Sequence, residues 1–365
     1  MRTKLLLVAL AGAVVACGVD GKMPTAPAAE APGATVPTRG PASFLAGVFL
    51  GDENTTPENV GAAMNKYAAE TGKKPALVKT FHYLAADLSP TGWAGKILHA
   101  IADGGATNYL ALDLDWPGRA SGSLLDAILR GDADARLDRA ARSIAQVKGT
   151  VLVEPAWEMN GNWNYAWQGI ANGNGAAPAK YVEAWRRVVD HFRAAGVTNV
   201  RWVFNPNTGN PVGGSNAGPS HWNWYGNYYP GDSYVDFIGA HGYNGPAVWK
   251  TPYHTFDDLF NGADADHMLR DMKERYPNKQ IILGEIGAEE TPGRDKGEWV
   301  RQAYEAMMRD PRIVGAVWFD MNKEADWRIS SSASSLAAYR AAMQSSAVAE
   351  RYNDALASHA LLASR

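Results

Sequence analysis

The chain has 365 residues, of which 46% are hydrophobic, so it is long enough to bury one large core or two ordinary ones. Its 35 basic and 38 acidic residues give a formal net charge of −3, which provides no electrostatic reason to expect nucleic acid or an anionic membrane surface as a partner. The single cysteine, Cys17, excludes an intrachain disulfide.

The N-terminal segment has the pattern of a secretory signal. Arg2 and Lys4 precede an apolar run over 5–15, which is too short to span a membrane as a stable helix. Residues 14–17 (VVAC) resemble the cleavage box of bacterial lipoproteins, in which the cysteine becomes the lipidated first residue. We therefore expect 1–17 to be a lipoprotein signal peptide and Cys17 a lipid anchor to a bacterial envelope membrane, facing the periplasm or the cell surface. The alternative is a secreted protein with an incidental cysteine.

Composition then divides the rest of the chain. Residues 18–42 are rich in Pro, Ala, Gly and Thr and contain almost no large apolar residue, so they cannot bury enough surface to offset their ordering entropy. We expect a disordered linker over 18–42, a single catalytic domain over 43–345 and a C-terminal helical tail over 346–365.

From residue 43 onward, short apolar runs alternate with longer amphipathic segments. Strands are predicted over 44–50, 76–81, 107–115, 150–157, 200–205, 235–242, 280–287 and 313–320. The clearest helices are predicted over 179–196, 267–276 and 298–309. Eight strands with helices between them are typical of a (β/α)8 TIM barrel. The doubly wound alternative needs a GxGxxG turn after an early strand, and none occurs there.

Polar and aromatic residues gather where the predicted strands end, which is where a barrel places its chemistry. They are Asp113, Asp115, Trp116, Trp157, Glu158, Asn160, Asn205, Asn207, His241, Tyr243, Asn244, Glu285, Trp318, Asp320 and Asn322. Buried carboxylates and amides cost free energy unless they are satisfied, so folding alone does not explain this asymmetry.

Glu158 and Glu285 stand out, since two carboxylates facing each other across a sugar are the minimum set for glycoside hydrolysis. Apolar neighbours such as Trp157 would keep Glu158 protonated, and Tyr243 could donate a hydrogen bond that keeps Glu285 ionised. Tryptophans, including Trp163 and Trp318, would stack on sugar faces, and Asn160 and Asn205 would bind hydroxyl groups. A lone glutamate at a strand end is, however, more often a salt-bridge partner than a catalyst.

Other candidate chemistries find little support. No cluster of His, Cys, Asp or Glu has metal-ligand spacing and the serine runs lack a nucleophile elbow, so we expect neither a metal nor a cofactor. We interpret Trp185, Trp202 and Trp299 as core residues, and His82 and His99 as structural.

The motifs WEMNGNW, VRWVFNPN, VDFIGAHGYN, ILGEIGA and VWFDMNKEADWRI resemble glycoside hydrolase family 26. The resemblance covers roughly residues 43–340 and implies a (β/α)8 retaining endo-enzyme, most often a β-1,4-mannanase and sometimes a mixed-linkage β-glucanase or a β-1,3-xylanase. It implies Glu158 as acid/base, Glu285 as nucleophile, Tyr243 as the partner of the nucleophile and Trp318 in the sugar-binding floor.

Three positions depart from the family pattern. Glu154 and Trp157 stand where mannanases of the family have Arg and His, and His241 stands where they have Asp. We expect Glu154 to raise the pKa of nearby carboxyl groups, and His241 to supply the lost positive or donor group beside the substrate. The expected partner is a polysaccharide, with β-1,4-mannan as the first candidate, and the protein is expected to be a monomer. An enzyme acting on the cell's own exopolysaccharide and a non-catalytic glycan-binding lipoprotein are the alternatives.

Overall fold

The computed structural model describes residues 44–213, 218–245, 252–290 and 293–353. The predicted signal peptide, the lipidated Cys17 and the linker over 18–42 therefore lie outside the described residues. The last part of the predicted C-terminal tail, from residue 354, lies outside them as well.

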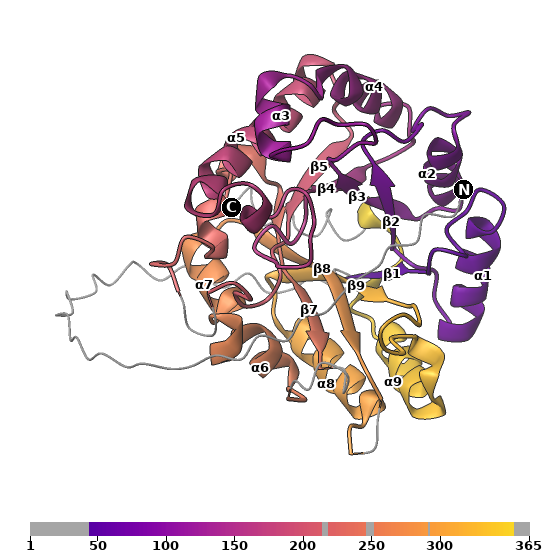
Figure 1. The fold of residues 1–365 in the computed structure, drawn as a ribbon. Helices are drawn as coiled ribbons and strands as arrows, with labels where there is room; N and C mark the ends of the chain where they lie inside the picture. Colours follow the sequence, from indigo (N-terminus) through magenta and orange to yellow (C-terminus); the bar gives the residue numbers. More distant parts are fainter. Residues whose placement is uncertain (1–43, 214–217, 246–251, 291–292, 354–365) are drawn as a thin grey trace, which may run out of the picture.

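The described strands form a closed parallel barrel (Figure 1). Its strands are β1 (Phe44–Phe49), β2 (Leu77–Tyr83), β3 (Thr107–Asp113), β4 (Val151–Pro155), β5 (Val200–Phe204), β6 (Phe237–Ile238), β7 (His241–Asn244), β8 (Gln280–Ala288) and β9 (Ile313–Phe319). Strand β9 pairs with β8 and with β1, which closes the sheet on itself. Short strands β6 and β7 both pair with β8 and together fill one position. The predicted (β/α)8 barrel is confirmed.

Helices surround the barrel between successive strands (Figure 1). They are α1 (Val60–Thr71), α2 (Trp93–Asp103), α3 (Leu124–Arg130), α4 (Asp134–Ile144), α5 (Ala177–Ala194), α6 (Phe256–Asn261), α7 (Met268–Arg275), α8 (Lys296–Arg309) and α9 (Ala333–Met343). In the predicted tail, Val348–Ala349 form strand β10, which pairs in parallel with the start of β1.

Burial explains why these segments adopt these elements. Strands β1 and β9 are buried at every residue, because each carries the barrel interior on one face and helices on the other. Helix α5 is amphipathic and turns Trp185 and Phe192 inward, as its periodicity predicts. Trp185, Trp202 and Trp299 are all buried, which confirms their interpretation as core residues.

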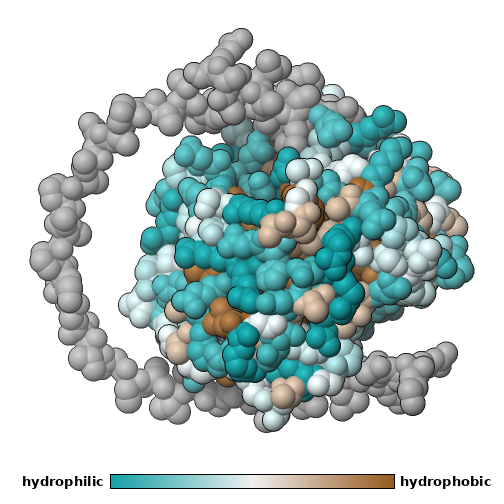
Figure 2. Space-filling model, turned by 90° about the horizontal axis from the view of Figure 1, so that it is seen from above, coloured by the Kyte–Doolittle hydropathy of each residue, from teal (hydrophilic) through white to brown (hydrophobic). Residues whose placement is uncertain are grey.

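The outer surface is mostly polar, with apolar residues in small scattered patches on the face that Figure 2 shows. Among the described residues, no helix combines the length and apolar character needed to cross a bilayer. The carboxyl ends of the strands all open at one end of the barrel, and this end carries the candidate site.

Candidate active site

The structure brings Glu158 and Glu285 together. Glu158 follows the end of β4 and Glu285 lies within β8, and both side chains are buried. One oxygen of each carboxyl group and one ring nitrogen of His241 all lie within 4.8 Å of one another. Glu158 and Glu285, which are 127 positions apart in the sequence, therefore lie next to each other, as the predicted eight-stranded barrel requires.

The backbone that presents Glu158 is held in an unusual conformation. Ala156 and Glu158 have φ values of 49° and 51°, in the left-handed region that non-glycine residues rarely adopt. Such strain costs about 1–3 kcal/mol per residue and persists only where the surroundings fix it. Here the Glu158 amide donates to the Asn205 carbonyl at 3.0 Å, and Gln168 donates to the Glu158 carbonyl at 3.1 Å. The acid side chain is thereby fixed on a rigid, strained turn.

A buried network lies directly behind the two glutamates. Lys79 Nζ, from β2, lies 2.6 Å from Glu154 Oε2 and 2.9 Å from Glu285 Oε1. His241 Nε2 lies 2.7 Å from Glu154 Oε1, and its Nδ1 lies 3.0 Å from Glu158 Oε1. Lys79 was not predicted from the sequence. A lysine at an inward position of the apolar run ALVKTF is nevertheless a detectable signal, because a buried ammonium group requires anionic partners.

Glu154 does not act as the unpaired negative charge that the sequence suggests. Burial alone would raise its pKa, but the charges of Lys79 and His241 hold the pKa of its carboxyl group below the ordinary value. Its charge is thus compensated by the two cations in contact with it. Burial would likewise lower the pKa of His241, but Glu285 and Glu154 raise it to about 9, so the imidazole is a cation at neutral pH.

The two candidate catalytic groups have opposite protonation preferences. Burial raises the pKa of Glu158 above its ordinary value, against the opposing effect of His241. Burial would raise the pKa of Glu285 too, but His241, Lys79 and the hydrogen bond donated by Tyr243 lower it well below the ordinary range. The predicted contact between Tyr243 and Glu285 is present. Burial therefore favours the protonated form of Glu158, whereas Glu285 is a carboxylate near neutral pH.

Aromatic rings form the walls around this pair. The Trp157 ring lies 5.4 Å from Phe81, 5.6 Å from Tyr165 and 4.8 Å from Trp167, measured between ring centroids. Trp163 is half-buried and lies edge-on to Tyr165 at 6.5 Å. Trp157 and Trp163 thus lie in one aromatic wall on the Glu158 side of the mouth.

The predicted asparagines serve the scaffold instead of the substrate. Both amide ends of Asn160 are used, since Nδ2 donates to the carbonyls of Asn207 and Gly209 and Oδ1 accepts from the Asn207 amide. Asn205 is buried and donates to Tyr109 Oη at 2.6 Å. Asn160 thus holds together the loops after β4 and β5, which does not agree with the expectation that it binds hydroxyl groups, whereas Asn205 Oδ1 has no hydrogen-bond partner among the described residues.

Close packing beneath the site also depends on a glycine. A Cβ atom on Gly284 would lie 2.4 Å from Asn205 Nδ2, 2.6 Å from His241 Nε2 and 2.7 Å from Tyr109 Oη. A side chain at this position would therefore displace the polar groups that surround the network.

Trp318 is not part of the mouth. It is fully buried, donates from Nε1 to the Trp327 carbonyl at 2.8 Å, and packs against Trp299 of α8 and Tyr339 of α9. The next residue, Phe319, faces inward instead and contacts Tyr243 at 5.7 Å between ring centroids. Successive strand residues point to opposite faces, so the predicted sugar-floor position was wrong by one residue of register.

The donor atoms of Glu158, His241 and Glu285 are close enough together to raise the question of a metal ion. A protonated imidazole offers no lone pair, and the His241 pKa of about 9 keeps it protonated. The Lys79 ammonium group already binds Glu285 at 2.9 Å. His241 and Lys79 thus already supply positive charge to Glu158 and Glu285, and this donor set does not fit a metal cation.

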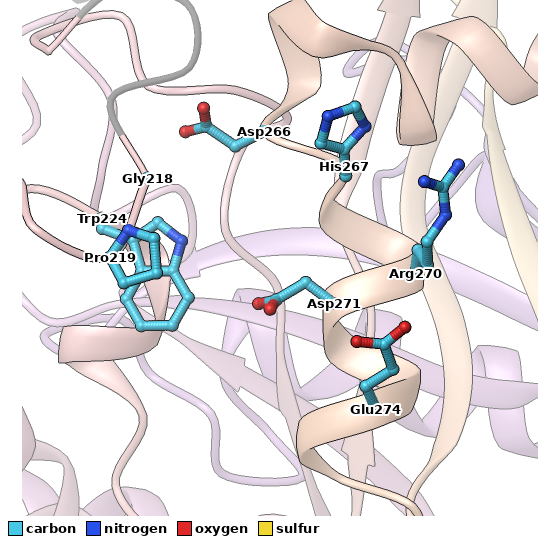
Figure 3. Close-up of a pocket in the computed structure, with 8 residues that line it drawn as sticks. All are labelled: Gly218, Pro219, Trp224, Asp266, His267, Arg270, Asp271 and Glu274. Carbon is cyan, nitrogen blue, oxygen red and sulfur yellow. The ribbon is translucent and has the colours of Figure 1, made fainter. Parts of the chain in front are cut away.

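A separate hollow lies between the segment 218–224 and α7 (Figure 3). It is lined by Gly218, Pro219, Trp224, Asp266, His267, Arg270, Asp271 and Glu274. Arg275 packs over the Trp224 ring at 4.5 Å and Tyr225 donates to Asp271, so part of its polar lining is engaged locally. No residue of the network around Glu158 and Glu285 lines this hollow.

The fold and the site together define a (β/α)8 barrel with paired, oppositely tuned carboxyl groups at the carboxyl ends of its strands. The model of glycosyl hydrolase family 26 matches residues 126–304, which include Glu158, His241, Tyr243 and Glu285. Over these residues the chain matches this family.

Two curated relatives match the sequence. Endoglucanase H of Acetivibrio thermocellus is 36% identical over 219 residues, which are 59% of this chain and 22% of that protein. A mannan endo-1,4-beta-mannosidase of Bacillus subtilis is 28% identical over 117 residues, which are 30% of this chain and 29% of that protein. The chain thus spans less than a third of the length of either relative.

Solved structures of the family share the fold. The catalytic domain of an endo-β-1,4-mannanase from Bacillus sp. JAMB-750 superposes with a TM-score of 0.60 at 18% identity, covering 84% of this chain and 87% of that chain. A Bacillus subtilis mannanase superposes with a TM-score of 0.56 at 17% identity, covering 82% of this chain and 86% of that chain.

Proposed function

We propose that this protein is an endo-acting retaining β-glycosidase that hydrolyses a β-linked polysaccharide. The observation that carries the proposal is the approach of Glu158 and Glu285, whose carboxyl oxygens lie within 4.8 Å, with the pKa of Glu158 raised by burial and that of Glu285 lowered by its cationic neighbours. Retaining glycosidases place the two groups about 5–5.5 Å apart, whereas inverting enzymes leave about 6.5–9.5 Å for a water molecule. The short separation therefore favours double displacement.

In the first step Glu285 attacks the anomeric carbon and forms a glycosyl ester, while Glu158 donates its proton to the departing glycosidic oxygen. In the second step Glu158, now a carboxylate, removes a proton from water, and the resulting attack on the anomeric carbon releases Glu285. Tyr243 donates to the Glu285 carboxylate and so holds it in one orientation for the attack.

A β-glucan is the better supported backbone. The relative with the higher identity over the larger part of the chain is named an endoglucanase. Mannose and glucose differ at the hydroxyl group next to the anomeric carbon, and Trp157 replaces the family's histidine beside the acid/base. β-1,4-Mannan is the second candidate, because the other curated relative is a mannan endo-1,4-beta-mannosidase.

The non-catalytic alternative does not need this electrostatic arrangement. A glycan-binding protein uses aromatic rings and hydrogen bonds, and burying three carboxyl groups with two cations would cost free energy without improving binding. The opposite tuning of Glu158 and Glu285 therefore supports turnover.

The test is release of reducing ends from galactomannan, glucomannan, mixed-linkage β-glucan, β-1,3-xylan and bacterial exopolysaccharides. We expect the highest rate on mixed-linkage β-glucan and background rates with Glu285→Gln. Binding of these polymers without release of reducing ends by the unaltered protein would favour the non-catalytic alternative.

We further propose that Cys17 carries the lipid anchor predicted above. The support is the VVAC segment after a short apolar run, both outside the described residues. A Cys17→Ser variant should then appear in the soluble fraction of expressing cells, and unchanged membrane association of that variant would contradict the proposal.

A further inference from the structure

Behind Glu158, four side chains of alternating charge form a closed ring. Lys79 contacts Glu154 at 2.6 Å, Glu154 contacts His241 at 2.7 Å, His241 contacts Glu285 at 3.5 Å, and Glu285 returns to Lys79 at 2.9 Å. We call these four residues the charge ring. All four side chains are at least 93% buried, since Glu285 is the most exposed at 7%.

Two cations and two anions make the charge ring neutral. Glu158 is attached to it through His241 Nδ1 at 3.0 Å, so an ionised Glu158 would add one uncompensated negative charge to a buried cluster. An uncompensated buried charge is costly, whereas a protonated carboxyl group adds none. Neutrality of the ring therefore favours a proton on Glu158.

We propose that Lys79 and Glu154 are positioning residues that act through the net charge of the ring to retain the proton on Glu158 between turnovers. This inference rests on the proposed function only in giving that proton a catalytic use. Neither residue is the acid or the nucleophile. Glu154 has no contact with Glu158 or Glu285 among those described, and its partners are Lys79, His241 and the neutral Tyr109.

Other titratable groups near the charge ring do not change its net charge. Burial raises the pKa of Tyr109, Tyr165 and Tyr243 above the ordinary value, so all three remain neutral. Glu324, in the loop after β9, is exposed and therefore screened by water. Asp113, Asp115 and Asp320 also follow strand ends, and burial raises the pKa of Asp113 to about 7 and that of Asp320 to about 6.

Glu154 and His241 are in contact at 2.7 Å and together form an ion pair without net charge. Lys79 then balances the remaining anion, Glu285.

The test reads the Glu158 proton directly and needs no substrate. The protein is labelled with carbon-13 at glutamate carboxyl groups, and the Glu158 signal is assigned by its loss in Glu158→Gln. Asp113 carries no label in this experiment. Lys79→Met leaves the ring with a net negative charge, so Glu158 should lose its proton about 1–3 pH units higher than in the unaltered protein. Lys79→Met/Glu154→Gln restores neutrality and should return the titration to near its original pH.

Lys79→Arg, which keeps the charge, is the matched control and should leave the titration in place. If Lys79→Met does not fold, Glu154→Gln decides the matter, since it leaves the ring with a net positive charge and Glu158 should then lose its proton at a lower pH than in the unaltered protein. A Glu158 titration that is unmoved in folded Lys79→Met, or shifted equally in the single and double variants, would overturn the inference. If the Glu158 titration follows the net charge of the ring but the protein hydrolyses none of the polysaccharides, only the proposed function is refuted.

Discussion

His241 Nδ1 lies 3.0 Å from Glu158 Oε1, so a buried imidazole cation from β7 contacts the carboxyl group that follows β4. The same ring reaches Glu154 through Nε2 at 2.7 Å, so both nitrogens are engaged by carboxyl groups. His241 therefore fixes the side chain of Glu158 through Nδ1 and is itself held by Glu154 through Nε2. Catalytic groups held in this way need little reorganisation during reaction.

Replacement of either glutamate should strongly reduce hydrolysis while sparing the fold. Glu158→Gln removes general acid catalysis, so kcat/KM on the polysaccharide should fall about 10²–10⁴-fold. Glu285→Gln removes the nucleophile and should leave only background release of reducing ends. Circular dichroism spectra matching that of the unaltered protein serve as the control. Full activity of either variant would show that the glutamate has another role.

Tyr243→Phe should move the acidic limb of the pH profile to higher pH. The hydroxyl group donates to Glu285 and is one cause of its lowered pKa, so its removal leaves the carboxylate easier to protonate. Hydrogen bonds to charged groups contribute about 1.5–3 kcal/mol, which corresponds to a loss of about tenfold to a hundredfold in kcat/KM. The pH dependence of kcat/KM tests this, and an unmoved acidic limb would contradict the assignment.

Asp113→Asn should stabilise the protein at pH 8 more than at pH 4. Burial raises the folded-state pKa of Asp113 to about 7, above its value in the unfolded chain. The folded state therefore binds this proton more tightly, and its stabilising contribution is complete at low pH and is lost as pH rises toward about 7. Asparagine does not ionise and can still accept from the Asp115 amide.

We expect the gain in Tm at pH 8 to exceed that at pH 4 by about 2 °C or more. Thermal unfolding at the two pH values measures it. Equal changes in Tm at both values would show that Asp113 titrates alike in the folded and unfolded states.

Trp318→Ala should cost stability and leave substrate binding alone. The side chain is fully buried between β9 and the helices, so its removal should destabilise the protein by about 3–5 kcal/mol. KM on the polysaccharide should not change at a temperature where the variant is folded. Trp163→Ala is the matched control, because the half-buried Trp163 lies in the wall beside Glu158 and should raise KM with a smaller loss of stability. A raised KM for Trp318→Ala together with an unchanged KM for Trp163→Ala would show that Trp318, and not Trp163, contacts the sugar.

The fold could be predicted from the sequence because the parallel strands are buried on both faces and appear as short apolar runs. The extents of β1 and β9 agree with their predicted runs to within a residue. The predicted strand over 235–242 is interrupted, because Gly239 and Ala240 separate β6 from β7. A Cβ on Gly239 would lie 1.9 Å from the Ile282 carbonyl oxygen, so the chain passes too close to β8 for a side chain there.

The candidate site was only partly predictable. Strand ends identified Glu158 and Glu285, and proximity along the barrel rim gave the contact with Tyr243. Lys79 was missed because an inward lysine in an apolar strand finds its anionic partners on β4 and β8, far away in sequence. Asn160 was misassigned because a residue list does not show that a side-chain amide is already saturated by neighbouring carbonyls.

The central claim is that Glu285 forms a covalent bond to the sugar. The most direct measurement uses an activated cellobioside that carries fluorine in place of the hydroxyl group next to the anomeric carbon, which slows breakdown of the glycosyl ester. We predict that mass spectrometry of the digested protein finds one sugar adduct, on the peptide containing Glu285, and none in Glu285→Gln. An adduct on Glu158 or on another residue would contradict the account.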